Sequence, residues 1–235
     1  MSIPFDATAA FLTNFKAELA ERGGDTDPKD FRAAGRRTKA KPNGEDALFW
    51  TTEGPRLVQA YIDWRETTAW SVWSLPDGSP AIELDITSNF LDVPVRTIID
   101  RVFETPDDQL VIMDLKSGSS KPDSKLQLEF YGVAVENIFG RRAEFGAYWH
   151  ARTGGLLELV PLTMTAQDIG EQLQAFRRAR AENIYIPHIT SMCKGCGVRH
   201  ACKYVGGADA DKYQNYGKGV PSRPDSYLAQ DGGTK

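Results

Sequence analysis

Two aspartates and a lysine are the residues of this chain best suited to chemistry on a phosphate ester. Asp100 lies within an apolar, β-branched run at 93–103. Asp114 and Lys116 lie near the end of the next such run, at 109–115. Carboxylate oxygens are preferred ligands of hard divalent cations, and a bound cation turns water into a nucleophile near neutral pH. A lysine beside that water would offset phosphate charge. These residue types predict metal-dependent cleavage of a phosphodiester.

The two runs must be neighbouring strands for these side chains to meet. Continuous apolar runs rich in Val and Ile are typical of strands buried on both faces. Between them, 104–108 has the composition of a turn, which predicts a hairpin. Asp114 and Lys116 are two positions apart, so both point to one face of the strand. Taken alone, Asp-x-Lys is more often a surface ion pair, but the strand context favours a catalytic site.

A helix predicted at 123–139 completes this set of elements. Gln127 and Tyr131 are four positions apart in it, which places both on one helical face. Two strands that carry acid and lysine, followed by such a helix, are the order of parts expected of a metal-dependent phosphodiester-cleaving site.

These stretches resemble the PD-(D/E)xK nuclease superfamily, specifically the RecB-type branch that includes the CRISPR-associated Cas4 exonucleases and their phage relatives. That branch carries Gly-x-x-Asp-Arg on one strand, Asp-x-Lys-Thr-Gly on the next, and Gln-x-x-x-Tyr on a helix. The corresponding stretches here are 97–101, 114–118 and 127–131. Thr97 replaces the glycine and Ser117 replaces the threonine.

The resemblance implies a role for each residue of the motifs. Asp100 and Asp114 would coordinate Mg²⁺ or Mn²⁺, with the main-chain oxygen of Leu115 as a further ligand. Lys116 would orient the attacking water, and Gln127 would position Lys116 or that water. The reaction implied is hydrolysis of DNA, with exonuclease action favoured.

Further contacts follow from the same resemblance. Tyr131 and Arg101 would contact DNA, although a packed core tyrosine is an equally good interpretation of Tyr131. Relatives often carry a histidine that completes the metal shell on the helix corresponding to 53–69. That helix has no histidine here, so Glu53 or Gln59 is the substitute.

The cysteines form a second cluster with metal-ligand spacing. Cys193, Cys196 and Cys202 are the only cysteines of the chain, and an odd, clustered set favours a metal over disulfides. The spacing is similar to the iron–sulfur loop of Cas4-like nucleases, which implies a 4Fe–4S cluster. Those relatives have a fourth, upstream cysteine that this chain lacks. Zinc is therefore the alternative, with His200 or His188 as the fourth ligand.

Composition indicates an ordinary globular protein. The chain has 235 residues, 41 % hydrophobic and 26 % charged, with a net charge of −4. No apolar run approaches the length of a membrane span, and the N-terminus lacks a signal pattern, so a cytoplasmic location is expected. The small net charge neither favours nor excludes DNA, because a nuclease concentrates acid at its metal site and base along a groove.

The expected organisation has three parts. Residues 1–50 hold an N-terminal helix and a basic, flexible loop. Residues 51–204 form the nuclease core, with the cysteine loop at 193–202. Residues 205–235 form a disordered tail, because they are rich in Gly, Asp, Ser and Pro.

The basic loop and the remaining elements complete the prediction. The loop is either a solvated linker or a phosphate-contacting arm; its DNA-binding candidates are Arg36, Arg37 and Lys39. Other helices are expected at 7–21, 53–69 and 166–181, and other strands at 70–75, 81–90, 144–151 and 156–162. The predicted fold class is α/β: a restriction-endonuclease-like core with a mixed central sheet flanked by helices, plus a C-terminal cysteine-rich metal loop.

Two other functions remain open at this level. One is a DNA-binding or adaptor module that keeps the nuclease fold with impaired catalysis, as the missing histidine and cysteine would allow. The other is a zinc-loop interaction protein whose strand carboxylates are structural. The nuclease interpretation expects DNA as partner, single-stranded or at duplex ends, no membrane, and a possible protein partner in recombination or repair.

Overall fold

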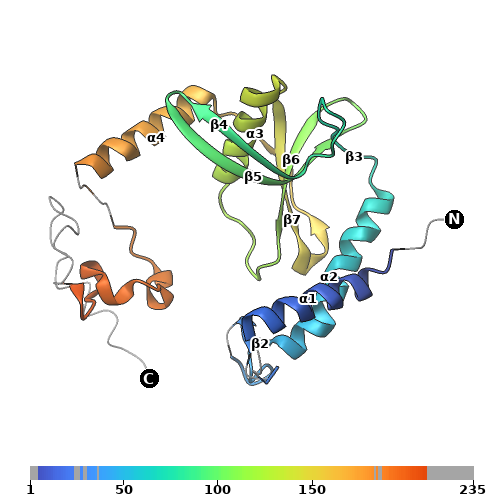
Figure 1. The fold of residues 1–235 in the computed structure, drawn as a ribbon, viewed down its shortest axis with the longest axis vertical. Coiled ribbons are helices and arrows are strands. Elements are labelled where there is room, and N and C mark those ends of the chain that lie inside the picture. Colours follow the sequence, from blue (N-terminus) through green and yellow to red (C-terminus); the bar gives the residue numbers. More distant parts are fainter. Residues whose placement is uncertain are drawn as a thin grey trace. The chain divides into compact units, whose positions relative to one another are not determined.

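The computed structural model describes residues 5–23, 27–28, 31–35, 37–182, 184 and 187–210. The chain divides into two compact units, Met1–Ala166 and Gln167–Lys235. The first unit contains the sheet and its covering helices (Figure 1). The second contains α4 (Ala166–Ala181) from its second residue onward, and the short helices η2 (Ser191–Gly195), η3 (Arg199–Ala201) and η4 (Lys203–Val205).

A mixed seven-stranded sheet is the centre of the first unit. The strands run in the order β3-β5-β6-β7-β8, with β4 paired to β5 and β9 paired to β7. Strands β5 (Val93–Glu104) and β6 (Leu110–Lys116) are antiparallel, as the predicted hairpin requires. Strand β7 (Ala143–His150) is parallel to β6, and α3 (Leu126–Phe139) makes the crossover between them. The remaining strands are β3 (Ser71–Val72), β4 (Ile82–Phe90), β8 (Gly155–Leu156) and β9 (Val160–Pro161).

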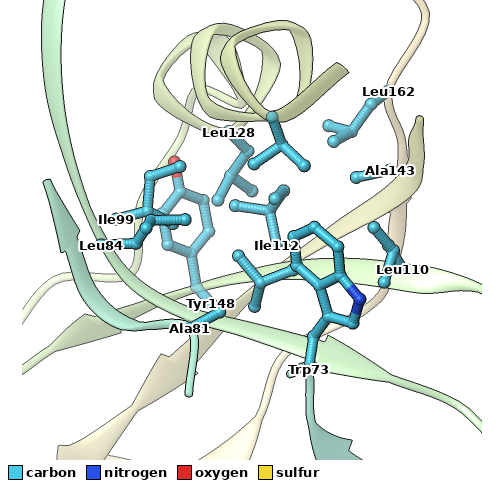
Figure 2. Close-up of a cluster of buried hydrophobic side chains, with 12 residues drawn as sticks. Trp73, Ala81, Leu84, Ile99, Leu110, Ile112, Leu128, Ala143, Tyr148 and Leu162 are labelled. Atoms are coloured by element: carbon cyan, nitrogen blue, oxygen red, sulfur yellow. The ribbon is translucent and has the colours of Figure 1, made fainter. Parts of the chain in front are cut away.

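Helix α3 covers one face of this sheet. Ile112 of β6, Ile99 of β5 and Tyr148 of β7 pack with Leu128 of α3 in one buried cluster (Figure 2). Ile112 and Leu128 are fully excluded from solvent. Because α3 follows β6 directly and packs back onto it, the residues at the end of β6 lie close to the start of α3.

The C-terminal half of helix α2 (Ala47–Thr67) packs against the other face. Val111 and Met113 of β6 point to this side and pack with Trp149 of β7. Tyr61 and Trp64 of α2 complete the cluster, with ring centroids 5.4 and 5.0 Å from that of Trp149. Alternate residues of β6 are therefore buried on opposite faces of the sheet, which confirms the prediction of a strand with no solvated side.

The N-terminal elements belong to the same unit. Helix α1 (Ala7–Gly23) packs on α2, where the ring of Phe11 occupies the space that a Cβ on Gly54 would fill. Strands β1 (Arg32–Ala34) and β2 (Glu45–Asp46) pair antiparallel. The Asp46 carboxylate then caps α2, since its Oδ1 accepts a hydrogen bond of 2.7 Å from the Phe49 amide.

Several expected elements differ in extent from those observed. The helix expected at 53–69 begins at Ala47, because Asp46 supplies its cap upstream of Pro55. The strands expected at 70–75 and 156–162 shorten to two-residue pairings at β3, β8 and β9. Residues 211–235, most of the expected disordered tail, lie outside the described residues. None of the described helices is long and apolar enough to cross a membrane.

Candidate active site

Asp100 stands where β5 and β6 separate. The two strands pair up to Arg101 and Met113, and beyond this point β6 continues beside β7 alone. In place of a backbone carbonyl of β5, the Asp100 side chain bonds the next part of β6. Its Oδ2 accepts a hydrogen bond of 2.7 Å from the Leu115 amide. The divergence of the strands thus brings the Asp100 side chain to the backbone between Asp114 and Lys116.

Asp114 is a buried carboxylate beside a second acid. Its side chain is 3 % exposed. Burial raises the pKa of Asp114, and the charge of Asp100 acts in the same direction, while Lys116 opposes both. Lys116 Nζ lies 2.6 Å from Asp114 Oδ2, yet this oxygen accepts no hydrogen bond of good geometry from the described residues. A buried oxygen of this kind, in a paired-carboxylate site, suits a divalent cation.

Lys116 connects the acidic pair to α3. Its Nζ donates a hydrogen bond of 3.0 Å to Gln127 Oε1, and Gln127 Nε2 donates one of 2.8 Å to the Tyr131 hydroxyl. The i,i+4 spacing of Gln127 and Tyr131 makes this second contact possible. Asp114, Lys116, Gln127 and Tyr131 therefore form one continuous polar chain from β6 to α3.

The other predicted contact residues are placed as follows. Arg101 is 19 % exposed and donates a hydrogen bond of 3.1 Å to Glu83 Oε1; it also contacts the Asp100 carbonyl. Arg37 and Lys39 are exposed, while Arg36 lies outside the described residues.

Glu53 is not brought to the aspartates. Both of its oxygens bind Arg56, at 2.5 and 3.1 Å, and the hydrogen bond to Arg56 lowers the pKa of Glu53. Within the described residues, no three His, Cys, Asp or Glu side chains form a group able to hold a metal. In this arrangement, Glu53 therefore does not serve as a third carboxylate ligand beside Asp100 and Asp114.

The cysteine loop, in the second unit, likewise provides no assembled metal site among the described residues. Cys193, Cys196 and Cys202 are free thiols that do not converge with one another or with His188 or His200 into a metal-binding group among the described residues. Cys193 Sγ instead lies 3.5 Å from the Thr190 amide, at the start of η2. The loop in this conformation does not fit a zinc ion or an iron–sulfur cluster.

The structure adds a buried ion pair that sequence analysis missed. Arg152 donates hydrogen bonds to Glu45 Oε2 at 2.7 Å and to the Ser117 carbonyl at 2.8 Å. Its guanidinium stacks 4.7 Å from the Trp50 ring centroid. Arg152 thereby fixes the backbone that follows Lys116. It lies in the short helix η1 (Ala151–Thr153) just before Gly154-Gly155, where an arginine has no distinguishing sequence signal.

Two further buried residues lie on β7 beside the site. His150 is 2 % exposed and is the strand partner of Lys116, with its Nδ1 3.2 Å from Thr153 Oγ1. Tyr148 donates a hydrogen bond of 2.8 Å to the Ser124 carbonyl and thus holds the segment before α3. Burial raises the pKa of Tyr148, and the charge of Asp114 adds to this effect.

Comparisons with known proteins match most of this chain. The sequence profile of the PD-(D/E)XK nuclease superfamily matches residues 13–203, a range that includes both aspartates, Lys116 and Gln127. The chain is also similar to the Gene 69 protein of Mycobacterium phage D29. The two are 29 % identical over 187 residues, which cover 70 % of this chain and 68 % of the phage protein.

Proposed function

Because the chain belongs to the PD-(D/E)XK nuclease superfamily, we propose that it is a divalent-cation-dependent deoxyribonuclease that hydrolyses DNA phosphodiester bonds. The observation that carries this proposal is the polar chain from Asp114 through Lys116 to Gln127, with Asp100 bound to the intervening backbone. A structural ion pair on a strand would need neither the second acid nor the support from α3.

Asp100 and Asp114 would hold Mg²⁺ or Mn²⁺, with the main-chain oxygen of Leu115 as a further ligand. Positive charge is favourable there, because the buried Asp114 carboxylate lies beside a second acid that disfavours its ionisation. When bound, such a cation lowers the pKa of a water molecule and polarises a phosphoryl oxygen.

Lys116 would act on the water and on the phosphate. Its ammonium can orient the attacking water and offset the charge that develops on the phosphoryl oxygens. Gln127 holds that ammonium through its side-chain oxygen, and the Tyr131 hydroxyl in turn accepts from the Gln127 amide. Gln127 is thus a positioning residue, and the rotamer of Lys116 is set before the substrate arrives.

We also propose that the enzyme is an exonuclease of the RecB and Cas4 type, acting at single-stranded or duplex ends in recombination, repair or DNA processing, together with a protein partner. The support is the order and spacing of the three motifs. The test compares end-labelled linear DNA with a closed circle of the same sequence, in Mg²⁺ or Mn²⁺. Digestion of the linear form alone is expected. Equal cleavage of the circle would establish an endonuclease, and cleavage of neither would contradict the proposed activity.

The cysteine loop has no part in the proposed hydrolysis. Cys193, Cys196 and Cys202 would take an iron–sulfur cluster or zinc only after the loop rearranges, because their sulfurs do not converge in the described conformation. The support for a metal is their clustering and their spacing. Such a centre would be structural.

A further inference from the structure

A cleft of about 490 Å³ adjoins the candidate active site on the α2 side of the sheet. It lies between α1, α2 and the ends of β6 and β7, all within the first unit. Leu115, Lys116 and Ser117 form part of its wall, and Arg101 contributes a positive charge. Its volume falls in the range of roughly 300–1,000 Å³ that is usual for sites of small organic groups.

The rest of the wall is apolar and unusually aromatic. Helix α1 contributes Phe11 and Phe15, whose rings stack with centroids 5.4 Å apart. Helix α2 and strand β7 contribute Trp50, Tyr61 and Trp149. Flat rings of this kind are the surfaces on which nucleobases stack, and such stacking accepts any base because every base has a π-face.

The positive charge in the cleft and the position of the cleft beside Lys116 favour a nucleotide as its occupant. Arg101 is bound to Glu83, whose side chain is 63 % exposed, so this ion pair is weak and can yield to a phosphate. The cleft also shares Leu115 and Lys116 with the site where the phosphodiester would react. A DNA strand engaged at Lys116 would therefore carry a neighbouring base to an aromatic wall and a neighbouring phosphate to Arg101.

We propose that this cleft is a nucleobase-binding subsite, in which a base of an unpaired strand packs against Phe15 and Tyr61. The inference rests on the proposed function and names its substrate more closely. A base inside a duplex is stacked and paired, and extruding it costs free energy that an unpaired base does not require. The enzyme should therefore act on single strands or on ends that have frayed.

Binding to an oligonucleotide that lacks one base tests the proposal. Single-stranded oligonucleotides with one abasic site, moved position by position, keep every phosphate but lose one base. Fluorescence anisotropy in EDTA then compares each with the intact strand. At one position, the wild-type protein should bind the intact strand roughly tenfold more tightly or better. In Phe15→Ala, this ratio should approach one.

A second variant and a control guard against misfolding. Val58→Trp would fill the cleft without removing any of its rings, and it should lower the ratio in the same way. Phe176→Ala is the matched control, because Phe176 is 66 % exposed and lies in the other unit. Thermal unfolding of each variant tests whether its fold is retained.

The outcomes separate this inference from the proposed function. Cation-dependent cleavage with equal binding of intact and abasic strands would overturn the cleft alone. Equal weakening of both strands by Phe15→Ala would also overturn it, because the ring would then act only on the fold or on phosphate binding. Base-dependent binding lost in Phe15→Ala, without cleavage in any cation, would support the cleft and contradict the nuclease. Absence of both binding and cleavage would overturn both.

Discussion

At Asp114, burial and charge act against each other. The carboxylate is almost inaccessible, and burial raises its pKa together with the charge of Asp100, although Lys116 lies 2.6 Å away. Because the pKa of Asp114 is raised overall, the ion pair with Lys116 does not compensate fully for the hydration that the carboxylate loses on burial. In the absence of metal, the ionised Asp114 is therefore a cost to folding.

This cost predicts a pH dependence of stability. A folded-state pKa above the unfolded value means that the contribution to stability is full below the unfolded pKa and is lost as pH rises through the folded pKa. In EDTA at neutral pH, Asp114→Asn should unfold at the wild-type temperature or above, with a smaller loss between acid and neutral pH. Mg²⁺ should raise the unfolding temperature of the wild type only. Circular dichroism melts measure this, and a clear drop for the variant in EDTA would show that the ion pair dominates.

Gln127 predicts a different kind of loss. In the proposed mechanism it acts through Lys116, so Gln127→Ala should lower kcat by about 10- to 100-fold, with little change in KM. Gln127→Glu keeps an oxygen that accepts from Lys116 and should recover much of the rate, which a purely structural role would not require. Gln172→Ala, on the exposed face of α4, is the matched control. Steady-state kinetics decide the matter; an unaltered kcat in Gln127→Ala would remove it from the site.

Among the elements, α3 is held to the segment after β9 by one buried carboxylate. Glu129 is 1 % exposed and accepts hydrogen bonds from the Thr163 and Met164 amides, at 2.9 and 3.0 Å. Lys125 lies 2.9 Å away. Burial raises the pKa of Glu129, but these three donors outweigh it, so the pKa lies below its ordinary value.

Glu129→Gln should therefore destabilise the first unit. A lowered folded-state pKa gives stability that is present above the unfolded pKa and lost as pH falls through the folded pKa. The variant should lose about 1–3 kcal/mol of unfolding free energy near neutral pH and less in acid. Urea unfolding at several pH values measures both quantities. Glu158→Gln, a glutamate on the exposed surface, is the control, and an equal loss at every pH would contradict the charge-based explanation.

The cysteine loop predicts a coupling between metal and stability. A metal that binds only the folded loop adds its binding free energy to folding. Protein purified without oxygen or chelator should carry iron or zinc in stoichiometric amounts, and Cys196→Ala should lower the unfolding temperature before it affects cleavage. Elemental analysis that finds neither metal would contradict the assignment. Zinc bound with His200 or His188 would show that the resemblance misled on the cofactor.

The predictable elements were those with strong local patterns. The β-branched runs of β5 and β6 predicted the hairpin, and the Asp-x-Lys spacing correctly placed two side chains on one face of β6. The start of α2 was missed because Gly54-Pro55 is typical of a helix start, whereas the cap is Asp46. The Arg152–Glu45 pair joins residues far apart in sequence, so no local pattern could reveal it.

DNA binding by the whole molecule includes the basic loop if that loop contacts phosphates. Arg37 and Lys39 are exposed, as either a solvated loop or a phosphate-contacting arm requires. Neutralising Arg36, Arg37 and Lys39 together should weaken DNA binding and reduce the slope of log K against log salt by about 0.7 per lost contact on a single strand. Replacing exposed Lys16 and Arg22 of α1 gives the control. An unchanged slope would leave only the linker interpretation.

The most direct test of the central claim is the cation dependence of DNA cleavage by purified protein and two site variants. Wild-type protein should degrade end-labelled DNA in Mg²⁺ or Mn²⁺ and not in EDTA. Asp114→Asn and Lys116→Ala should abolish cleavage, while Asp107→Asn in the exposed turn between β5 and β6 should retain it. Cleavage that persists in EDTA, or that survives in both site variants, would contradict the account.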